Sequence, residues 1–371
     1  MASTSPGYGI TIRVEGSPDL QPVAHITSAL SAAGATITAL DVVESLLDRV
    51  VIDVTCDTIN ADHADEITES LNKIEGLVVR KVSDRTFLLH LGGKIEVTSK
   101  VPLKTRDDLS RAYTPGVARI SQAIVDDPTN VRRLTMKRNT VAVVTDGSAV
   151  LGLGNIGPAA ALPVMEGKAA LFKRFADVDA WPVCLDTQDV DEIVRTVQLI
   201  APVYGGINLE DISAPRCFEV EARLRQLLDI PVFHDDQHGT AIISSAALLN
   251  ALELAKKKID KVKIVISGAG SAALACANLY VLLGVKPENI IMFDKDGVLS
   301  SDRLDLSDLQ KRYSHGHKNA TLKEALSGAD VFLGLSAGNI LSPDMLLGMA
   351  KDPIVFAMAN PIPEIDYELA I

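Results

Sequence analysis

The sequence predicts an α/β protein of three successive blocks, and two patterns in its 371 residues predict this class. Residues 9 to 87 alternate apolar strand-like runs with two helical runs in the order βαββαβ, the order of a ferredoxin-like split βαβ unit. Towards the end of the chain, strands alternate with helices and a glycine-rich turn joins one strand to the next helix. We expect domains at 1–88, 89–245 and 246–371.

Composition restricts the possible partners. The net charge of −12 argues against a nucleic-acid or anionic-membrane surface, because both need clustered Lys and Arg. No run reaches the roughly 18 apolar residues that span a bilayer, and the start has no basic region before an apolar one. The four cysteines are scattered singly, which indicates reduced thiols rather than a disulfide framework or zinc site. We expect a cytoplasmic protein with a small-molecule partner.

The first block contains strands at 9–15, 36–44, 49–57 and 78–84 and helices at 21–35 and 61–74. It contains no cluster of His, Cys or paired acids that would indicate catalysis. Its order resembles an ACT domain, a regulatory module that often binds an amino acid, although the loop GSPDLQP lacks the usual Pro-Gly turn. A small-molecule effector site is one interpretation, and a plain dimerisation or packing module is the other.

The stretch GAGSAA, 268 to 273, follows the strand-like run KVKIVIS and opens a long helical run. A second strand, NIIMFD, ends at Asp294, 26 residues after Gly268. This context predicts a dinucleotide site, since glycines let the backbone approach a pyrophosphate, the helix N-terminus faces it, and the acid reaches a ribose hydroxyl. The predicted cofactor-binding residues are Gly268, Gly270, Ser271, Ala272, Ala273 and Asp294.

A second glycine stretch, GLGNIG at 152 to 157, does not fit that context. Pro158 and Pro163 follow it, which predicts that no long, unbroken helix that faces a phosphate begins there. The next strand-like acid, Asp186, lies 34 residues past Gly152, beyond the usual interval of about 20. Lys168 follows at the start of a plausible helix, where it either points into a pocket or faces solvent.

Acidic pairs follow two strand-like runs. Glu210 and Asp211 come after LIAPVYGGI, and Asp235 and Asp236 come after IPVFH. Several carboxylate oxygens from two loops suit a hard divalent cation such as Mg²⁺ or Mn²⁺. Tyr113 precedes a Pro-Gly turn, where a tyrosine alone usually indicates packing.

The segment HDDQH has a competing interpretation, because His234 and His238 have the spacing of a zinc-protease helix. The glutamate required after the first histidine is Asp235 here, and a helix over both histidines is not expected, since a strand precedes them and a Gly-Thr turn follows. Hydrogen bonding or support of a neighbouring site is the preferred role for both histidines.

Six motifs, taken together, resemble malic enzymes of the prokaryotic type over residues 90 to 371: YTPGVA, GLGNIGPAAALPVMEGKAALFK, INLEDISAPRCFEVE, VFHDDQHGTAI, GAGSAA and ANPIPE. The resemblance implies a malate-binding α/β domain, a Rossmann NAD(P)-binding domain and the oxidative decarboxylation of L-malate to pyruvate and CO₂. It also implies a divalent metal between these two domains, and a homodimer or higher even-numbered homo-oligomer.

Carried over residue by residue, the resemblance implies Glu210, Asp211 and Asp236 as ligands of Mg²⁺ or Mn²⁺, with Asp235 supporting catalysis beside them. Lys168 would be the general base, which a nearby cation and partial burial favour by keeping it neutral, and Tyr113 the general acid. The resemblance further implies Ser336 as a cofactor-binding residue and Asn360 as a contact of the substrate carboxylate. For the choice between NAD and NADP, Asp294 favours NAD⁺, whereas Lys295 could accept a 2′-phosphate.

Two departures and two alternatives accompany the resemblance. Ala149 and Val150 stand where larger eukaryotic-type malic enzymes have an arginine, and the family continues beyond Ile371 with an NQVNN-bearing segment, so the nucleotide domain is expected to be truncated. A malolactic or oxaloacetate-decarboxylating enzyme on the same scaffold is one alternative. A ligand-sensing regulatory protein with an inactive core is the other.

Overall fold

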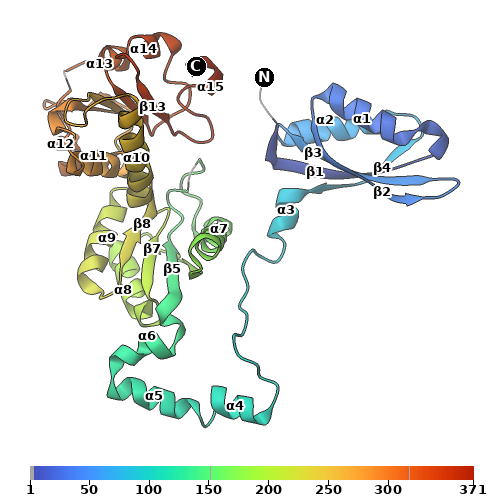
Figure 1. The fold of residues 1–371 in the computed structure, drawn as a ribbon, viewed down its shortest axis with the longest axis horizontal. Coiled ribbons are helices and arrows are strands. Elements are labelled where there is room, and N and C mark those ends of the chain that lie inside the picture. The colour runs from blue at the N-terminus through green and yellow to red at the C-terminus, as the bar shows by residue number, and fades with distance from the viewer. Residues whose placement is uncertain (1–3, 151, 317) are drawn as a thin grey trace. The chain divides into compact units, whose positions relative to one another are not determined.

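The computed structural model describes residues 4–150, 152–316 and 318–371, and residues 1–3, 151 and 317 lie outside this description. The chain divides into two compact units, Met1–Val97 and Thr98–Ile371 (Figure 1). Each unit is described by itself below.

The first unit is a four-stranded antiparallel sheet with two helices, in the predicted βαββαβ order. Its strands follow one another as β2-β3-β1-β4. Buried residues alternate with more exposed ones in β1 from Ile10 onwards and throughout β3. The buried side chains of these strands, including Ile12, Val14, Ile52 and Val54, pack against Ile26, Leu30, Ile67 and Leu71 of the helices. The elements are β1 (Ser5–Gly16), α1 (Pro22–Ala33), β2 (Thr36–Ser45), β3 (Val50–Thr58), α2 (Ala61–Asn72), β4 (Leu77–Asp84) and α3 (Arg85–His90).

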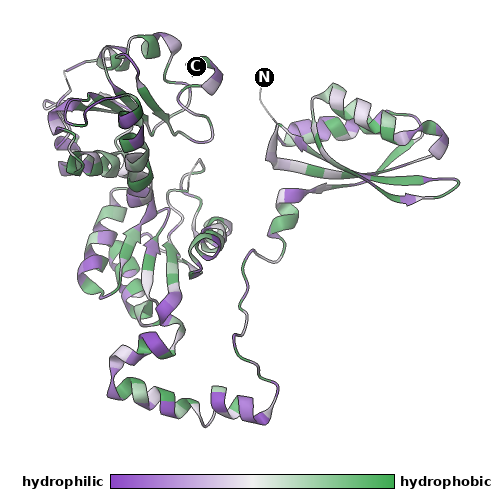
Figure 2. Ribbon diagram, viewed as in Figure 1, coloured by the Kyte–Doolittle hydropathy of each residue, from purple (hydrophilic) through white to green (hydrophobic). Residues whose placement is uncertain are grey.

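The second unit begins with an arm of short helices that is poorly packed. The arm consists of α4 (Arg106–Ala112), α5 (Val117–Asp126) and α6 (Val131–Leu134), none of which contains a buried residue among those described. Its helices nevertheless carry hydrophobic as well as hydrophilic residues (Figure 2), and Leu109 and Val125 are exposed. The arm leads into β5 at the amino end of that strand.

A parallel sheet in the order β6-β5-β7-β8 follows the arm. In Figure 1, α7 lies on one side of this sheet, and α8 and α9 lie on the other. Apolar side chains of α8 and α9, among them Val197 and Val220, form one buried cluster with Ala142, Val144 and Leu209. The elements are β5 (Thr140–Thr145), α7 (Pro158–Ala176), β6 (Asp179–Cys184), α8 (Val190–Ile200), β7 (Gly206–Leu209), α9 (Arg216–Leu227) and β8 (Val232–His234).

The second sheet of this unit has the order β11-β10-β9-β12-β13, and all its pairs are parallel except β10 with β11. The order reverses between β9 and β12, as in a Rossmann fold, where ligands bind at the carboxyl ends of the strands at such a reversal. The strands are β9 (Ile264–Ser267), β10 (Ile290–Asp294), β11 (Gly297–Val298), β12 (Val331–Gly334) and β13 (Ile354–Ala357). The helices are α11 (Ser271–Leu282), α12 (Asp308–Lys311), α13 (Leu322–Leu326), α14 (Pro343–Leu347) and α15 (Tyr367–Ala370).

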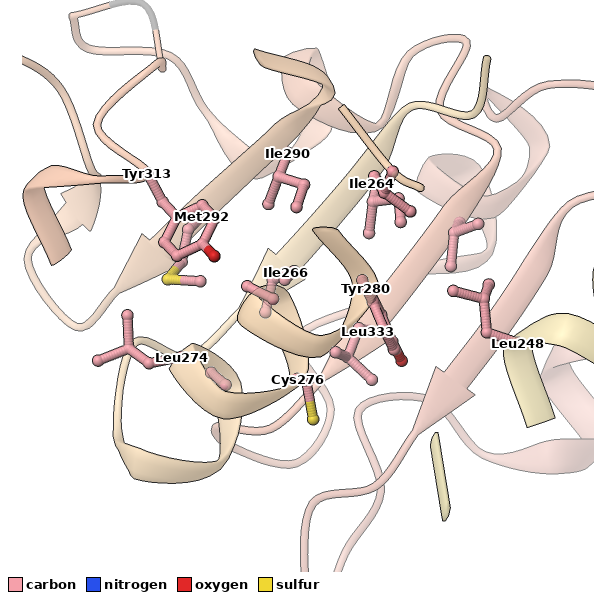
Figure 3. Packing of buried hydrophobic residues seen from close by; sticks show 14 of the residues in the cluster. Leu248, Ile264, Ile266, Leu274, Cys276, Tyr280, Ile290, Met292, Tyr313 and Leu333 are labelled. Atoms are coloured by element: carbon pink, nitrogen blue, oxygen red, sulfur yellow. The ribbon is translucent and has the colours of Figure 1, made fainter. Parts of the chain in front are cut away.

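Helix α10 (Asp235–Leu254) connects the two sheets of the second unit. It starts directly after β8, and its Leu248 and Leu252 belong to the core of the second sheet, packed with Tyr280 of α11 and with Ile264 and Leu333 (Figure 3). The expected domain boundary at residue 245 therefore falls inside one continuous helix. Within the described residues, none of the helices is both long enough and apolar enough to cross a membrane.

Candidate active site

The acids predicted to bind a metal lie together at the carboxyl ends of β7 and β8. Because these two strands are parallel neighbours, Glu210 and Asp211 emerge from the same edge of the sheet as Asp236. Carboxylate oxygens of these three residues all lie within 4.8 Å of one another. Asp211 has a left-handed backbone, with φ of 53°, and its amide donates to Asp236 Oδ2 at 2.9 Å.

Lys168 reaches the same cluster from α7. Its Nζ lies 3.0 Å from Glu210 Oε1 and donates to Asp235 Oδ2 at 2.7 Å, and only 21% of its side chain is exposed. The alternative of a solvent-facing lysine is therefore wrong. The structure gathers four carboxylates and one ammonium group from three separate segments of the chain.

The charge balance of this cluster indicates a cation site. Burial raises the pKa of both Glu210 and Asp211 to about 7, even though Lys168 opposes the shift. The acids of the cluster outnumber its one lysine, and neighbouring carboxylates raise both pKa values further. Three closely spaced oxygen donors with uncompensated negative charge fit a hard divalent cation such as Mg²⁺ or Mn²⁺.

The protonation of Lys168 depends on the same charges. Burial lowers its pKa, but Glu210 and Asp235 together outweigh burial, so that the pKa lies above its ordinary value. Partial burial alone therefore does not keep this lysine neutral, contrary to the expectation from the sequence. A divalent cation among the same carboxylates would oppose their effect and favour the neutral amine.

The stretch GLGNIG lies between β5 and α7 and packs against the loop that follows β5. The amides of Ile156 and Gly157 both donate to the carbonyl of Gly147 at 3.1 Å. A Cβ atom on Gly147 would lie 2.3 Å from the carbonyl oxygen of Gly157, so glycine is required for this approach.

The prediction that no long, unbroken helix begins after GLGNIG is wrong. Helix α7 starts at Pro158 and continues through Pro163 for 19 residues. Pro158 occupies the first helical position, where no amide donor is needed, and Pro163 removes only one donor from a long helix. Lys168 consequently lies in the middle of α7 and not at its start.

The two histidines of HDDQH do not converge on a metal. His234 is the last residue of β8 and is fully buried, so the helix does not span both histidines, as expected. The expected turn at Gly239 and Thr240 is wrong, because both residues lie within α10. His234 Nε2 lies 3.6 Å from Asp236 Oδ2, and neither of its ring nitrogens has a hydrogen-bond partner among the described residues. His238 hydrogen-bonds Glu221 at 2.7 Å.

In the predicted dinucleotide loop, one glycine is required by packing and another faces open space. Gly268 has φ of +117°, and a Cβ there would lie 2.5 Å from the carbonyl oxygen of Leu335. Gly270 precedes the first residue of α11, Ser271, and open space surrounds the position of its missing Cβ. The first-turn residues Ser271, Ala272 and Ala273 therefore present a helix N-terminus to this space.

Two further predicted residues lie beyond the strand ends of the same sheet. Ser336 follows β12, and its hydroxyl hydrogen-bonds that of Ser267 at 2.8 Å. Asn360 follows β13 and is exposed. The sequence did not reveal Glu364, which is fully buried and accepts hydrogen bonds from the amides of Ser336, at 3.2 Å, and Ala359, at 3.0 Å. It links the two segments that carry Ser336 and Asn360.

Asp294 lies at the end of β10, as predicted, but its nearest cation is not Lys295. Lys295 is 87% exposed and pairs with Asp296, whereas Arg303 forms two hydrogen bonds of 2.8 Å with Asp294. The sequence did not reveal Arg303 as the partner of Asp294, because Arg303 stands nine positions later in the chain and a loop brings it back.

Asp146 was also not identified from the sequence. It follows β5, its side chain is fully buried, and it pairs with Arg216 at 3.1 Å. Its charge contributes to the raised pKa of Asp211. The sequence signal that could have revealed Asp146 is its position between the apolar run of β5 and Gly147.

The structure does not bring Tyr113 to this cluster. Tyr113 follows α4 on the arm and is 67% exposed. The arm lies at the amino end of β5, whereas the acids gather at the carboxyl ends of the strands (Figure 1).

Comparison with known proteins agrees with this arrangement. The family described as "Malic enzyme, N-terminal domain" matches residues 92–225, and the family described as "Malic enzyme, NAD binding domain" matches residues 237–368. The solved NAD-dependent malic enzyme of Thermotoga maritima superposes with a TM-score of 0.74 at 47% identity, over 78% of each chain.

Two curated relatives extend the comparison. The NAD-dependent malic enzyme of Geobacillus stearothermophilus is 53% identical over 365 residues, which are 97% of this chain and 76% of that protein. The NADP-dependent malic enzyme of Rhizobium meliloti (strain 1021) is 53% identical over 277 residues, 74% of this chain but only 36% of that longer protein. With both family matches and these relatives, the chain belongs to the malic enzyme family.

Proposed function

We propose that this chain catalyses the oxidative decarboxylation of L-malate to pyruvate and CO₂ with reduction of NAD⁺ or NADP⁺, and that it requires Mg²⁺ or Mn²⁺. The observation that carries the proposal is the cluster of buried Glu210 and Asp211 with half-buried Asp236, in contact with Lys168, in a member of this family. A dinucleotide loop in the same compact unit supports it.

Glu210, Asp211 and Asp236 would hold the divalent cation. When bound, this cation polarises the C2 oxygen of malate and stabilises negative charge on that oxygen as CO₂ leaves. The oxidised nicotinamide supplies the hydride acceptor. Gly268, Gly270 and the first turn of α11 would bind the cofactor pyrophosphate, with Ser336 at the next strand end, and Asn360 would contact a substrate carboxylate.

Lys168 would accept the proton of the C2 hydroxyl as the hydride departs. Its hydrogen bond to Asp235 holds Nζ next to the carboxylate cluster, so the lysine is positioned before substrate arrives. Asp235 therefore acts through Lys168, as the acceptor that fixes the direction of the amine.

Tyr113 would donate a proton to C3 after decarboxylation. Because the arm that carries it lies at the other end of the sheet, Tyr113 is best placed to complete the site of a second copy in a homodimer. The exposed apolar residues of the arm, including Leu109 and Val125, support such an interface, since a partner would bury them.

The first unit would regulate the enzyme. It has the element order of an ACT domain, and the Geobacillus stearothermophilus relative aligns over nearly the whole chain, so its sequence includes this region. An amino acid or similar small molecule that binds the first unit should change the KM for malate without entering the active site.

One assay tests the main proposal. Reduction of NAD⁺ and of NADP⁺ is followed with L-malate and Mn²⁺, and pyruvate is measured in the same sample. Metal-dependent reduction matched by pyruvate supports malic enzyme activity. Formation of lactate without net reduction of the nucleotide would instead indicate the malolactic alternative. If the chain consumes oxaloacetate added in place of malate but does not oxidise malate, it is the decarboxylase. Binding of an effector without turnover of either substrate would indicate the regulatory protein.

A further inference from the structure

Arg303 and Asp294 form a paired fork at the edge of the predicted nucleotide site. Arg303 Nη1 donates to Asp294 Oδ1, and Nη2 donates to Oδ2, both at 2.8 Å. Both side chains are largely buried, with exposed fractions of 15% for Arg303 and 17% for Asp294. Such parallel, charge-assisted hydrogen bonds are the strongest pairing available to an arginine and a carboxylate.

This fork occupies the acid that would otherwise meet the cofactor ribose. Asp294 Oδ1 also accepts a hydrogen bond from the amide of Asp296 at 2.9 Å. A carboxylate has about four acceptor positions, and the two hydrogen bonds from Arg303 and the one from Asp296 occupy three of them. On Arg303, Nε and Nη2 also donate to Asp305, which leaves one N–H of Nη1 unused.

The fork belongs to the nucleotide site and not to a distant surface. The amide of Gly268, in the glycine loop, donates to the carbonyl of Phe293, the residue before Asp294, at 2.8 Å. From the other side, Gln310 Nε2 donates to the carbonyl of Ala269 at 3.3 Å. The segment that contains Arg303 is thus attached to the loop that would bind the pyrophosphate.

A metal site is the competing explanation for these acids, since Asp294, Asp296 and Asp305 have carboxylate oxygens within 4.8 Å of one another. Cations of the chain already meet all three. Arg303 pairs with Asp294 and Asp305, and Lys295 pairs with Asp296 at 2.9 Å. Two cationic side chains thus offset most of the charge of the three acids, and each acid has a cationic partner within the chain.

We propose that Arg303 determines how this chain selects between NAD⁺ and NADP⁺, by neutralising Asp294 and donating hydrogen bonds to a 2′-phosphate. The proposal rests on the proposed use of a dinucleotide in this domain. An unpaired acid at this position repels a 2′-phosphate, whereas a nearby arginine accommodates it. The unused N–H of Nη1 can donate to a 2′-phosphate while the fork continues to neutralise Asp294, and NAD⁺ needs neither effect.

Calorimetric titration of NAD⁺ and NADP⁺ into the full chain tests this assignment independently of turnover. Arg303→Ala should weaken NADP⁺ binding by about tenfold or more while NAD⁺ binding stays within about threefold, because Asp294 then carries an uncompensated charge. Lys311→Ala is the matched control, since it removes an equal charge from an exposed pair with Asp308 in the same segment and should change neither affinity. Asp294→Ala, which frees Arg303, should shift the preference towards NADP⁺ and provides the test if Arg303→Ala fails to fold.

The outcomes are distinct. An unchanged NADP⁺ to NAD⁺ ratio in both Arg303→Ala and Asp294→Ala, or an equal loss of both nucleotides in Arg303→Ala, would overturn the assignment of Arg303 and leave the proposed activity standing. A wild-type chain that binds neither nucleotide would overturn both proposals. A Lys311→Ala effect as large as that of Arg303→Ala would show general electrostatics in place of a specific contact.

Discussion

The ammonium group of Lys168 lies between two carboxylates, 2.7 Å from Asp235 and 3.0 Å from Glu210. One side chain therefore joins the middle of α7 to the end of β7 and the start of α10. This position makes Lys168 both the counter-ion of the acidic cluster and the basic group nearest to it.

Replacing Lys168 by alanine should lower kcat by about 10²- to 10⁴-fold, the usual contribution of a general base. Nucleotide affinity should stay unchanged, because α11 and the glycine loop belong to the other sheet. Initial-rate kinetics and nucleotide titration measure the two effects. Lys173→Ala on the same helix, at an exposed pair with Asp177 and Asp179, is the control and should retain activity. Near-normal turnover in Lys168→Ala would disprove the base assignment.

Metal binding should weaken as the pH falls through 7. Glu210 and Asp211 have pKa values of about 7 in the metal-free protein, so protons compete with the cation below that pH. We expect the Kd for Mn²⁺ to rise by about ten- to hundredfold between pH 8 and pH 6. Titration in buffers of different ionisation enthalpy should also detect proton release on binding. Glu210→Gln should release fewer protons, and a pH-independent Kd would contradict the prediction.

The same two acids set the sign of a stability effect. Their native pKa values are raised, so between about pH 4 and pH 7 the native state binds more protons than the unfolded chain. Stability of the metal-free protein should therefore decrease as the pH rises through this range, and Mn²⁺ should raise Tm more at pH 8 than at pH 6. Thermal unfolding with and without Mn²⁺ measures both trends.

The two inactive variants Tyr113→Phe and Lys168→Ala should restore activity to each other when mixed. If Tyr113 completes the site of a second copy, a mixed dimer has one site with both native side chains. Random reassembly after mild denaturation should return about a quarter of the wild-type activity, because half of the dimers are mixed and half of their sites are intact. Activity absent from a mixture whose mixed dimers are verified by mass spectrometry would rule out a shared site.

Alanine at Gly268 and alanine at Gly270 should have different effects. Gly268→Ala forces a side chain into a positive φ and against the carbonyl oxygen of Leu335, so it should lower the free energy of unfolding by about 1–3 kcal/mol. Gly270 has an ordinary φ of −85° and open space around it, so Gly270→Ala should fold normally and mainly weaken nucleotide binding. Thermal unfolding and nucleotide titration separate the two, and equal loss of stability in both would contradict the packing argument.

Several features could be predicted because they depend on local pattern. Apolar strand-like runs in the sequence predicted the strands of the first unit. Acids that follow two such runs predicted a shared site of Glu210, Asp211 and Asp236, and the structure brings them together because parallel strands end at one edge of the sheet. The run from strand to glycine loop to helix predicted the start of α11 in the same way.

Other features depend on tertiary contacts that the sequence does not display. Pro163 suggested an interruption of α7. The packing of this 19-residue helix beside β5 and β6 stabilises it by more than the loss of one backbone hydrogen bond at Pro163 destabilises it. The partner of Asp294 is set by the path of a loop, and an immediate neighbour, Lys295, was the only cation that local reasoning could offer. The location of Tyr113 likewise depends on where the arm of α4 and α5 packs.

Helix α10 gives the second unit a mechanical property. Its 20 residues span about 30 Å, with Asp235 and Asp236 in the first turn and Leu248 and Leu252 in the core of the nucleotide-binding sheet. A tilt of about 5° imposed on the first turn, as carboxylates close around a cation, displaces the far end by roughly 2.6 Å. Because no loop interrupts the helix, the positions of the two acids and of the nucleotide-binding sheet are fixed to one another through a single rigid element.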